Sequence, residues 1–418
     1  MQNDDVGHEA KSDELIVQLG NQWMLRNRGN EIMRKYYTSS VMRLVAKLKK
    51  HCRTITNLKD ENLDGFLKPK HFDAVVQAAL WCFSVNGDEE DLLSPSNCIK
   101  LGHDIKRMLS TKLATAIKND DDLKRKEVEG FTKLMDIEWG LRVTKLARSI
   151  LNDRTFNQER QLPLPSDVKK LAEYLIKVIT DLDLLVQTFA QFRKVAILNL
   201  ARITLYNRRR CHEVQAMRLT AYSSRKTGID QIGAEIRGDL TKFEHHLLEH
   251  QDVVVIRGKT GRGVPVILPP DVHNSFKYLS NEAVRRTAGI PSTNKYLYAS
   301  AGAGVFRAYE AIREVTSDPK AGLQMPNLIR TSNMRKYMAT MLQAMNTTES
   351  ERQWVIDHLG HTMNVHQTHY RQTSDMLERV EVAKILLVQD LNLVSKYGGK
   401  KLADIQLDGR FMSSHFIE

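Results

Sequence analysis

Apolar residues recur at intervals of three and four over most of the first 150 positions. The positions that begin this pattern are Ile16, Leu19 and Trp23, followed by Val41, Leu44, Val45 and Leu48. Such spacing places the apolar side chains on one face of a helix, and no stretch before residue 150 alternates long enough to predict a strand. The sequence therefore predicts an all-α domain over residues 13–160, preceded by a polar, disordered tail over residues 1–12.

The helical pattern breaks at the Leu-Pro-Leu-Pro sequence of positions 162–165, because proline removes a backbone donor and disfavours helix at the residue before it. Beyond this boundary, the apolar runs 253–256 and 264–268 predict two strands joined by a glycine-rich turn. Helices are expected on both sides of this hairpin. The chain is thus predicted to be mainly α with a small antiparallel sheet (α+β), with a second domain over residues 161–395 and a tail over residues 396–418.

The composition favours a soluble protein with an anionic partner. The 418 residues carry a formal net charge of +12, with a pI near 9.4; this balance is typical of proteins that bind polyanions, although solvated basic surfaces also produce it. Four scattered cysteines indicate reduced thiols in an intracellular protein. No apolar run reaches the roughly 20 residues that span a membrane, and the polar, acidic N-terminus does not resemble a signal peptide.

The most informative stretch, residues 356–371, contains a Leu-Gly-His-Thr turn and, nine residues after its histidine (370 − 361), a tyrosine followed by an arginine. Gly360 allows a turn after a helix, so His361 and Tyr370 can face one pocket. A phenolic oxygen suits reversible attack on a phosphodiester, because a phenolate is both an adequate nucleophile and a tolerable leaving group. The alternative is a buried tyrosine in an ordinary helix with surface histidines around it.

Three basic features elsewhere can complete such a site. Arg210 ends an apolar helix three residues before Glu213, whose carboxylate can hold the guanidinium in place. Lys259 lies at the expected hairpin tip, and Arg335 lies near the start of an amphipathic helix. Each of them alone is typical of a solvated surface. Together with a histidine and a tyrosine, they supply the clamps, proton donor and nucleophile that phosphoryl transfer needs.

The sequence contains no complete motif for a nucleotide-binding loop or for a metal site. The Gly-Lys-Thr run at 258–260 lacks the glycine that a phosphate-binding loop requires five residues before its Gly-Lys, because Val253 stands there. The histidines between positions 358 and 369 are dense, yet no His-Glu-x-x-His pattern accompanies them, and no strand carries carboxylates for a two-metal site. Neither a metal nor a cofactor is therefore expected.

In this order, the residues resemble those of the tyrosine recombinases, the family of site-specific DNA recombinases and integrases, over roughly residues 160–400. The family's motifs correspond here to Arg210 with Glu213, the hairpin lysine Lys259, the His-x-x-Arg box at 332–335, the Leu-Gly-His box at 359–361 and the nucleophile Tyr370. The helical N-terminal domain is similar to the family's core-binding domain. An Asn-Arg-Arg-Arg run and a Val-His-x-x-x-Tyr-Arg ending resemble eukaryotic mobile-element members such as the Crypton transposons.

The resemblance implies a DNA breaking-rejoining catalytic domain that acts on double-stranded DNA through a 3′-phosphotyrosyl intermediate without a cofactor. The implied catalytic residues are Arg210, Lys259, Arg335, His361 and Tyr370, supported by Glu213, Ser332 and His358. The residues expected to contact DNA are Arg43, Lys47, Lys50, Arg208, Arg209, Arg257, Arg262 and Lys336. The resemblance further implies a homotetramer on two DNA sites, a role in DNA integration or transposition, and a nuclear location if the source is eukaryotic.

Two other functions remain open. A type IB topoisomerase uses similar residues but relaxes supercoils as a monomer and needs no synapsis. A non-catalytic DNA-binding protein derived from a recombinase is favoured by Ser332, which stands where most family members have a histidine. A serine can donate a hydrogen bond but is not a charged acid near neutral pH. Formation of a covalent protein–DNA adduct distinguishes an enzyme from this last class.

Overall fold

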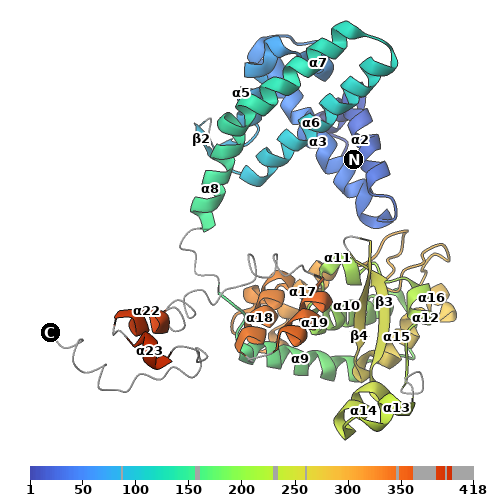
Figure 1. Cartoon of the computed structure of the whole chain (residues 1–418). Coiled ribbons are helices and arrows are strands. Elements are labelled where there is room, and N and C mark those ends of the chain that lie inside the picture. The colour runs from blue at the N-terminus through green and yellow to red at the C-terminus, as the bar shows by residue number, and fades with distance from the viewer. Residues whose placement is uncertain are drawn as a thin grey trace. The chain divides into compact units, whose positions relative to one another are not determined.

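The chain divides into two compact units, Met1–Glu159 and Arg160–Glu418, each with a hydrophobic core of its own (Figure 1). The structure is a computed structural model that describes residues 1–85, 88–155, 161–228, 234–258, 261–344, 348–360, 383–390 and 393–397. Among these residues, no helix combines the length and the hydropathy needed to cross a bilayer.

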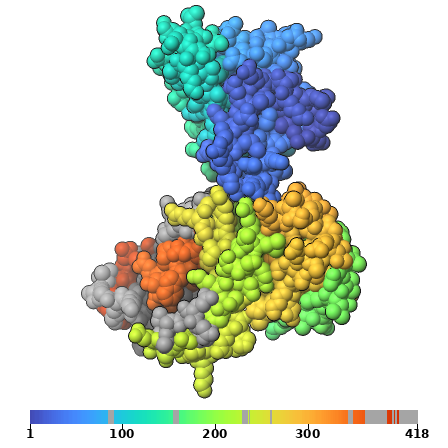
Figure 2. All heavy atoms as spheres, turned by 90° about the vertical axis from the view of Figure 1, so that its right-hand side faces the viewer, coloured from blue at the N-terminus to red at the C-terminus, as the bar shows by residue number. Residues whose placement is uncertain are grey.

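The first unit is a helical domain with one very small hairpin. Its elements are α1 (Asp5–Ser12), α2 (Glu14–Arg26), α3 (Glu31–Thr56), α4 (Leu63–Phe66), η1 (Pro69–His71), α5 (Phe72–Trp81), β1 (Ser84–Val85), β2 (Asp88–Leu92), α6 (Pro95–Lys118), α7 (Asp122–Leu134), the π-helical η2 (Met135–Thr144) and α8 (Lys145–Thr155). In Figure 2, the first of these helices (dark blue) and the last ones (cyan to green) occupy different parts of the visible face of the unit. The hairpin β1–β2 is an addition to the all-α domain that the sequence predicts.

The segment expected to be a disordered tail contains the helix α1. The Asp4 side chain caps it by accepting a hydrogen bond from the Gly7 N–H at 2.8 Å, and Arg43 on α3 binds both oxygens of Asp4. Ala10 of α1 is fully buried in the core. A cap, an ion pair and a buried face together offset the loss of chain entropy, which polarity alone did not reveal.

The second unit is also mainly helical. Its elements before the hairpin are α9 (Pro165–Thr180), α10 (Phe189–Tyr206), α11 (Cys211–Val214), α12 (Leu219–Ser223), α13 (Ala234–Gly238) and α14 (Lys242–His250). The elements after the hairpin are η3 (Pro270–Val272), α15 (His273–Ser280), α16 (Glu282–Thr287), α17 (Ala308–Thr316), η4 (Pro319–Ala321), η5 (Pro326–Leu328), α18 (Thr331–Ala344), α19 (Glu349–Leu359), α22 (Ala383–Asp390) and α23 (Val394–Tyr397).

The hairpin consists of β3 (Asp252–Arg257) and β4 (Gly263–Leu268), which pair antiparallel with Val254 opposite Val266. Val254 and Ile256 are buried while Val255 and Arg257 are exposed, the alternation of a strand with one face on a core. The prediction of a mainly α fold with a small antiparallel sheet is therefore confirmed.

Helix α10 is the centre of this unit. Every residue from Val195 to Leu205 is buried, including Asn199, Arg202 and Thr204. Because α10 is packed against protein on all sides, its position in the unit is fixed. The start of the turn that follows Tyr206 is therefore fixed as well. This turn begins the candidate functional site.

Candidate functional site

Asn207 anchors the turn at the end of α10. Its side chain is 2% exposed, and its amide oxygen accepts from the Ile267 N–H at 2.7 Å while its amide nitrogen donates to the Ile267 carbonyl at 2.8 Å. Both backbone groups of one β4 residue are thus satisfied by one side chain. Arg208 follows in the left-handed region, with φ at 52°, which reverses the chain. The backbone conformation of the turn therefore fixes the positions of Arg209 and Arg210.

Arg210 is held from two sides. Its Nη1 donates to Glu213 Oε1 at 3.2 Å, within one turn of α11, and its Nη2 donates to the Gly360 carbonyl at 3.5 Å. Glu213 itself is 2% exposed, so the carboxylate is a fixed partner rather than a mobile surface group. The Arg-x-x-Glu spacing thus forms the ion pair that the sequence suggests.

Arg335 connects the α10 turn with the end of α19. It is 2% exposed, and it donates from Nη1 to the Arg208 carbonyl at 2.9 Å and from Nη2 to the Leu359 carbonyl at 2.7 Å. These acceptors lie 127 and 24 residues away in the sequence. Arg210 and Arg335, which the sequence places in separate motifs, therefore meet at the consecutive carbonyls of Leu359 and Gly360.

Helix α19 ends at this meeting point. A capping box between Thr348 and Glu351 begins the helix, and Gly360 ends it in the left-handed conformation, with φ at 63°. A Cβ atom built on Gly360 would lie 3.5 Å from Arg210 Nη1 and 3.9 Å from Arg209 Nη1. Both are ordinary contact distances, so glycine is needed here for the left-handed turn rather than for space.

His358, two residues before Gly360, contacts the same turn after α10. Its Nε2 lies 2.9 Å from the Asn207 carbonyl and donates to it, which leaves Nδ1 as an acceptor. Burial lowers the pKa of His358, and the charges of Arg209 and Arg335 lower it further, while the hydrogen bond to Asn207 opposes them. The neutral imidazole is therefore favoured at physiological pH.

Arg209 requires a correction. It was expected to contact DNA, but its side chain is 0% exposed, and its Nε and Nη2 both donate to the Pro265 carbonyl at 3.1 and 2.6 Å. Burial lowers the pKa of Arg209 to about 10. Its Nη1 has no hydrogen-bond partner among the described residues. Enclosed and bound to the Pro265 carbonyl, Arg209 acts through the electrostatic field that its charge adds at Arg210 and His358.

The remaining expected residues fall into three groups. Lys259, His361 and Tyr370 lie outside the described residues. Ser332 is exposed on the first turn of α18, three residues before Arg335. The expected DNA contacts Lys47, Lys50, Arg257 and Arg262 are exposed, Lys336 and Arg208 are half-buried, and Arg43 is half-buried in its pair with Asp4.

Glu213 pairs with Arg210 and interacts electrostatically with Arg209, while Arg210 and Arg335 both repel Arg209, so this part of the site has an excess of positive charge. Arginine forks bind the oxygens of a phosphate in a bidentate manner. Within the described ranges, no group of three or more histidine, cysteine, aspartate or glutamate side chains could hold a metal ion. The arrangement can therefore bind and polarise an oxyanion through nitrogen donors.

Asn207 is the residue of this site that the sequence analysis missed. Its role depends on Ile267, 60 positions later, and the only local signal is a polar residue directly after an apolar helix.

No protein-family model matches the chain, and no curated protein matches it. Two similar solved structures are complexes of the XerH site-specific recombinase, one bound to its difH substrate before cleavage and one bound to a palindromic difH substrate after cleavage. Their sequences are 14% and 12% identical to this chain, with TM-scores of 0.37 and 0.40. Each alignment covers 92% of this chain and 98% of the other. At this level of identity and with these TM-scores, the likeness carries no argument about function. The function of this chain is therefore argued from its own residues.

Proposed function

We propose that the protein is a metal-independent DNA strand transferase of the tyrosine recombinase type. The observation that carries the proposal is the meeting of Arg210 and Arg335 at the consecutive carbonyls of Leu359 and Gly360. The next residue in the chain is His361, and Tyr370 follows within ten positions. Two fixed guanidinium groups beside a segment that contains a phenol provide the charge and the nucleophile for attack on a phosphodiester.

In this reaction the Tyr370 phenolate attacks the scissile phosphorus, a phosphorus–oxygen bond forms on the 3′ side, and the bond to the 5′ oxygen breaks. Lys259 donates the proton that converts the leaving oxygen into a 5′-hydroxyl. Arg210 and Arg335 stabilise the negative charge that develops on the non-bridging oxygens, and His361 binds one of these oxygens. The phosphotyrosyl bond conserves the energy of the phosphodiester, so a 5′-hydroxyl can reverse the reaction without a nucleotide.

The electrostatic contribution follows from the contacts of the arginines. Both are held by buried or half-buried partners before substrate arrives, so little reorganisation accompanies the reaction. Removal of one such preorganised donor typically lowers the rate by about 10²–10³. We infer a similar loss for Arg210→Ala and for Arg335→Ala.

The proposal extends to the biological setting. We infer recombination of double-stranded DNA by a homotetramer on two DNA sites, as part of integration or transposition by a mobile element related to the Cryptons. The nucleus would be its location if the source is eukaryotic. Support for this setting comes only from the order of the motifs and from the basic composition.

Incubation with a suicide DNA substrate, followed by a denaturing gel, tests the reaction. Wild-type protein is expected to form a covalent adduct in the presence of EDTA, and Tyr370→Phe is expected to form none while its DNA affinity stays nearly unchanged. The matched control is Tyr337→Phe, because Tyr337 lies on α18 two residues after Arg335 and is the nearest rival phenol in the motifs. An adduct from the Tyr370 variant but not from the Tyr337 variant would assign attack to Tyr337.

Ser332 favours a second candidate, a non-catalytic DNA-binding protein. Its hydroxyl is exposed at the position where the family's histidine assists proton transfer, and a hydroxyl is a far weaker acid than an imidazolium. If the site is catalytic, Ser332→Ala should retain the adduct and Ser332→His should form it at least as fast. Absence of an adduct from wild type and both variants, with DNA binding intact, would establish the non-catalytic function.

A further inference from the structure

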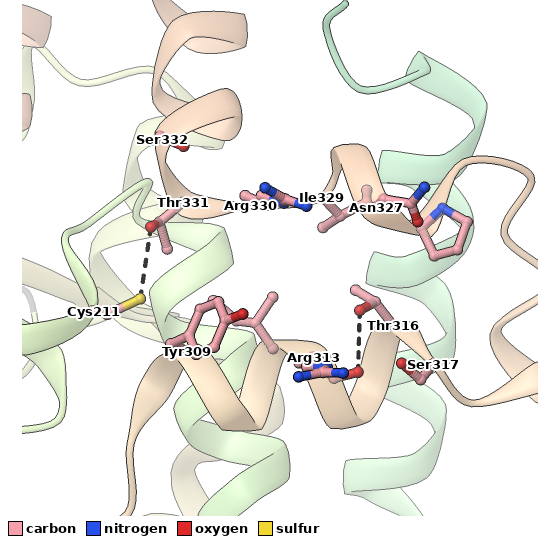
Figure 3. A pocket seen from close by; sticks show the side chains of 12 residues that line it. Cys211, Tyr309, Arg313, Thr316, Ser317, Asn327, Ile329, Arg330, Thr331 and Ser332 are labelled. Atoms are coloured by element: carbon pink, nitrogen blue, oxygen red, sulfur yellow. Dashed lines mark hydrogen bonds between the residues drawn. The ribbon is translucent and has the colours of Figure 1, made fainter. Parts of the chain in front are cut away.

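A groove of about 660 Å³ lies between α17 and the segment that leads into α18. Figure 3 shows Tyr309 and Arg313 on the α17 side, and Asn327, Arg330 and Thr331 on the opposite side. The other residues that line it are Cys211, Ile312, Thr316, Ser317, Pro326, Ile329 and Ser332. No aspartate or glutamate is among the residues that line the groove. Its polar surface thus consists of arginines, hydroxyls and one amide, which is a lining suited to an anion.

The arginines of the groove are not neutralised by neighbouring acids. Within the part of the chain that the structure describes, the guanidinium groups of Arg313 and Arg330 make neither an ion pair nor a hydrogen bond. The acidic side chains on the same helix as Arg313 are engaged elsewhere: Glu310 with Arg307 at 3.2 Å and Glu314 with Arg193 at 2.6 Å. Two exposed, unpaired guanidinium groups on facing walls thus offer donors to one anion in the groove.

The groove adjoins the candidate catalytic residues through the chain itself. Cys211 follows Arg210, and Ser332 lies three residues before Arg335. The Cys211 Sγ and the Thr331 Oγ1 are 3.6 Å apart, so α11 and the start of α18 meet at this wall. A ligand in the groove therefore touches the segments that position both catalytic arginines.

We propose that this groove is a second phosphate subsite, in which Arg313 and Arg330 clamp a backbone phosphate of the bound DNA outside the scissile position. The inference rests on the DNA partner of the proposed function but does not require strand cleavage. Backbone phosphates position nucleic acid on a protein without reading its sequence. The groove would thus set the register of the DNA relative to Arg210 and Arg335.

Alkylation of Cys211 provides a local measure of occupancy, because this half-buried thiol lines the groove. The Tyr370→Phe variant removes cleavage from the experiment. Its Cys211 is labelled with iodoacetamide at mildly alkaline pH, with and without a DNA duplex, and the labelled peptide is quantified by mass spectrometry. DNA is expected to slow the labelling several-fold, and the added changes Arg313→Ala and Arg330→Ala are expected to abolish this protection.

The matched control is Arg286→Ala, since Arg286 is an exposed arginine of the same unit whose partner is Glu282; it should leave the protection unchanged. Inorganic pyrophosphate replaces DNA in a parallel experiment. Protection by pyrophosphate with none by DNA would overturn the assignment to a backbone phosphate in favour of a free phosphate ligand. Equal protection in the double variant and in the control would overturn the subsite.

Salt dependence gives a second, independent measurement. Each phosphate contact contributes about 0.9 to the slope of log affinity against log salt concentration. The double change of Arg313 and Arg330 to alanine should therefore reduce the slope by about 0.9 while Arg286→Ala leaves it unchanged. An unchanged slope in the double variant contradicts the subsite, whereas absence of a covalent adduct from wild type contradicts only the cleavage reaction, so the two failures are distinguishable.

Discussion

At the scale of single residues, the candidate site is unusual for how deeply it buries positive charge. Arg209 and Arg335 are 0% and 2% exposed, although arginine is rarely fully buried unless it is paired. Backbone carbonyls rather than carboxylates accept the hydrogen bonds from Arg209 to Pro265 and from Arg335 to Arg208 and Leu359. Carbonyls satisfy the donors without neutralising the charge, so the positive potential remains available to an anion.

The titration of His358 measures this potential. Burial is the largest cause of its lowered pKa and Arg209 is the second, so Arg209→Met should raise the pKa of His358 without restoring the ordinary value of about 6.5. Arg209→Lys, which keeps the charge, should leave it low. NMR titration of the imidazole is the measurement, and an identical pKa in all three proteins would contradict a field from Arg209.

A lowered pKa has a consequence for stability. Because the folded protein disfavours the imidazolium while the unfolded chain does not, the unfolded state binds more protons as the pH falls below about 6.5. His358 therefore destabilises the fold progressively from that pH down through its folded pKa. As the pH falls over this range, the free energy of unfolding of wild type should decrease relative to that of His358→Gln.

At the scale of elements, the geometry of the site depends on the C-terminus of α19. Its C-cap residue Gly360 has a positive φ, and the Gly360 carbonyl accepts from Arg210. An L-residue in the left-handed region costs roughly 1–2 kcal/mol. Gly360→Ala should lower the free energy of unfolding by about this amount and should also slow adduct formation, because relief of the strain turns the carbonyl away from Arg210.

Gly322 offers a matched control for this prediction. Its φ is 62°, and a Cβ atom built there meets nothing within 4 Å. Gly322→Ala should cause a similar loss of stability, measured by urea unfolding, with no change in the rate of adduct formation. Equal rates for both variants would show that the Gly360 turn is structural only.

At the scale of the whole molecule, the two units have separate cores, and each carries exposed residues expected to contact DNA. On the first unit these are Lys47 and Lys50, which protrude from α3 next to buried apolar positions. Arg43 on the same helix is instead bound to Asp4 in bidentate fashion. Binding of a polyanion by both units should make the affinity depend steeply on salt.

The contribution of the first unit can be measured with the full chain. The double change Lys47→Ala and Lys50→Ala should reduce the slope of log affinity against log salt concentration by about 0.9 for each phosphate contact that is lost. Arg125→Ala is the control, because Arg125 is an exposed arginine of the same unit paired with Glu129. Identical slopes for the three proteins would exclude a DNA contact through this face of α3.

The arrangement of elements followed from local signals in the sequence. The periodicity of apolar residues predicted the helices, and the apolar runs at 253–256 and 264–268 predicted the hairpin. Such patterns act within a few residues, so they can be recognised without knowledge of the fold. The helix α1 escaped prediction because its stability depends on Arg43, 39 residues from Asp4.

For the site, the sequence by itself determined the residue types, the Arg210–Glu213 pair and the turn at Gly360, all of which lie within one or two helical turns. Only the tertiary structure decided which of the three consecutive arginines after Asn207 is buried. Three identical side chains on one turn have no periodicity, and their burial depends on Pro265, 56 residues after Arg209. The position of Arg335 likewise depends on the Arg208 carbonyl, 127 residues away. Contacts at such separations are set by the packing of the whole unit around α10, because each side chain occupies the space that its distant neighbours leave.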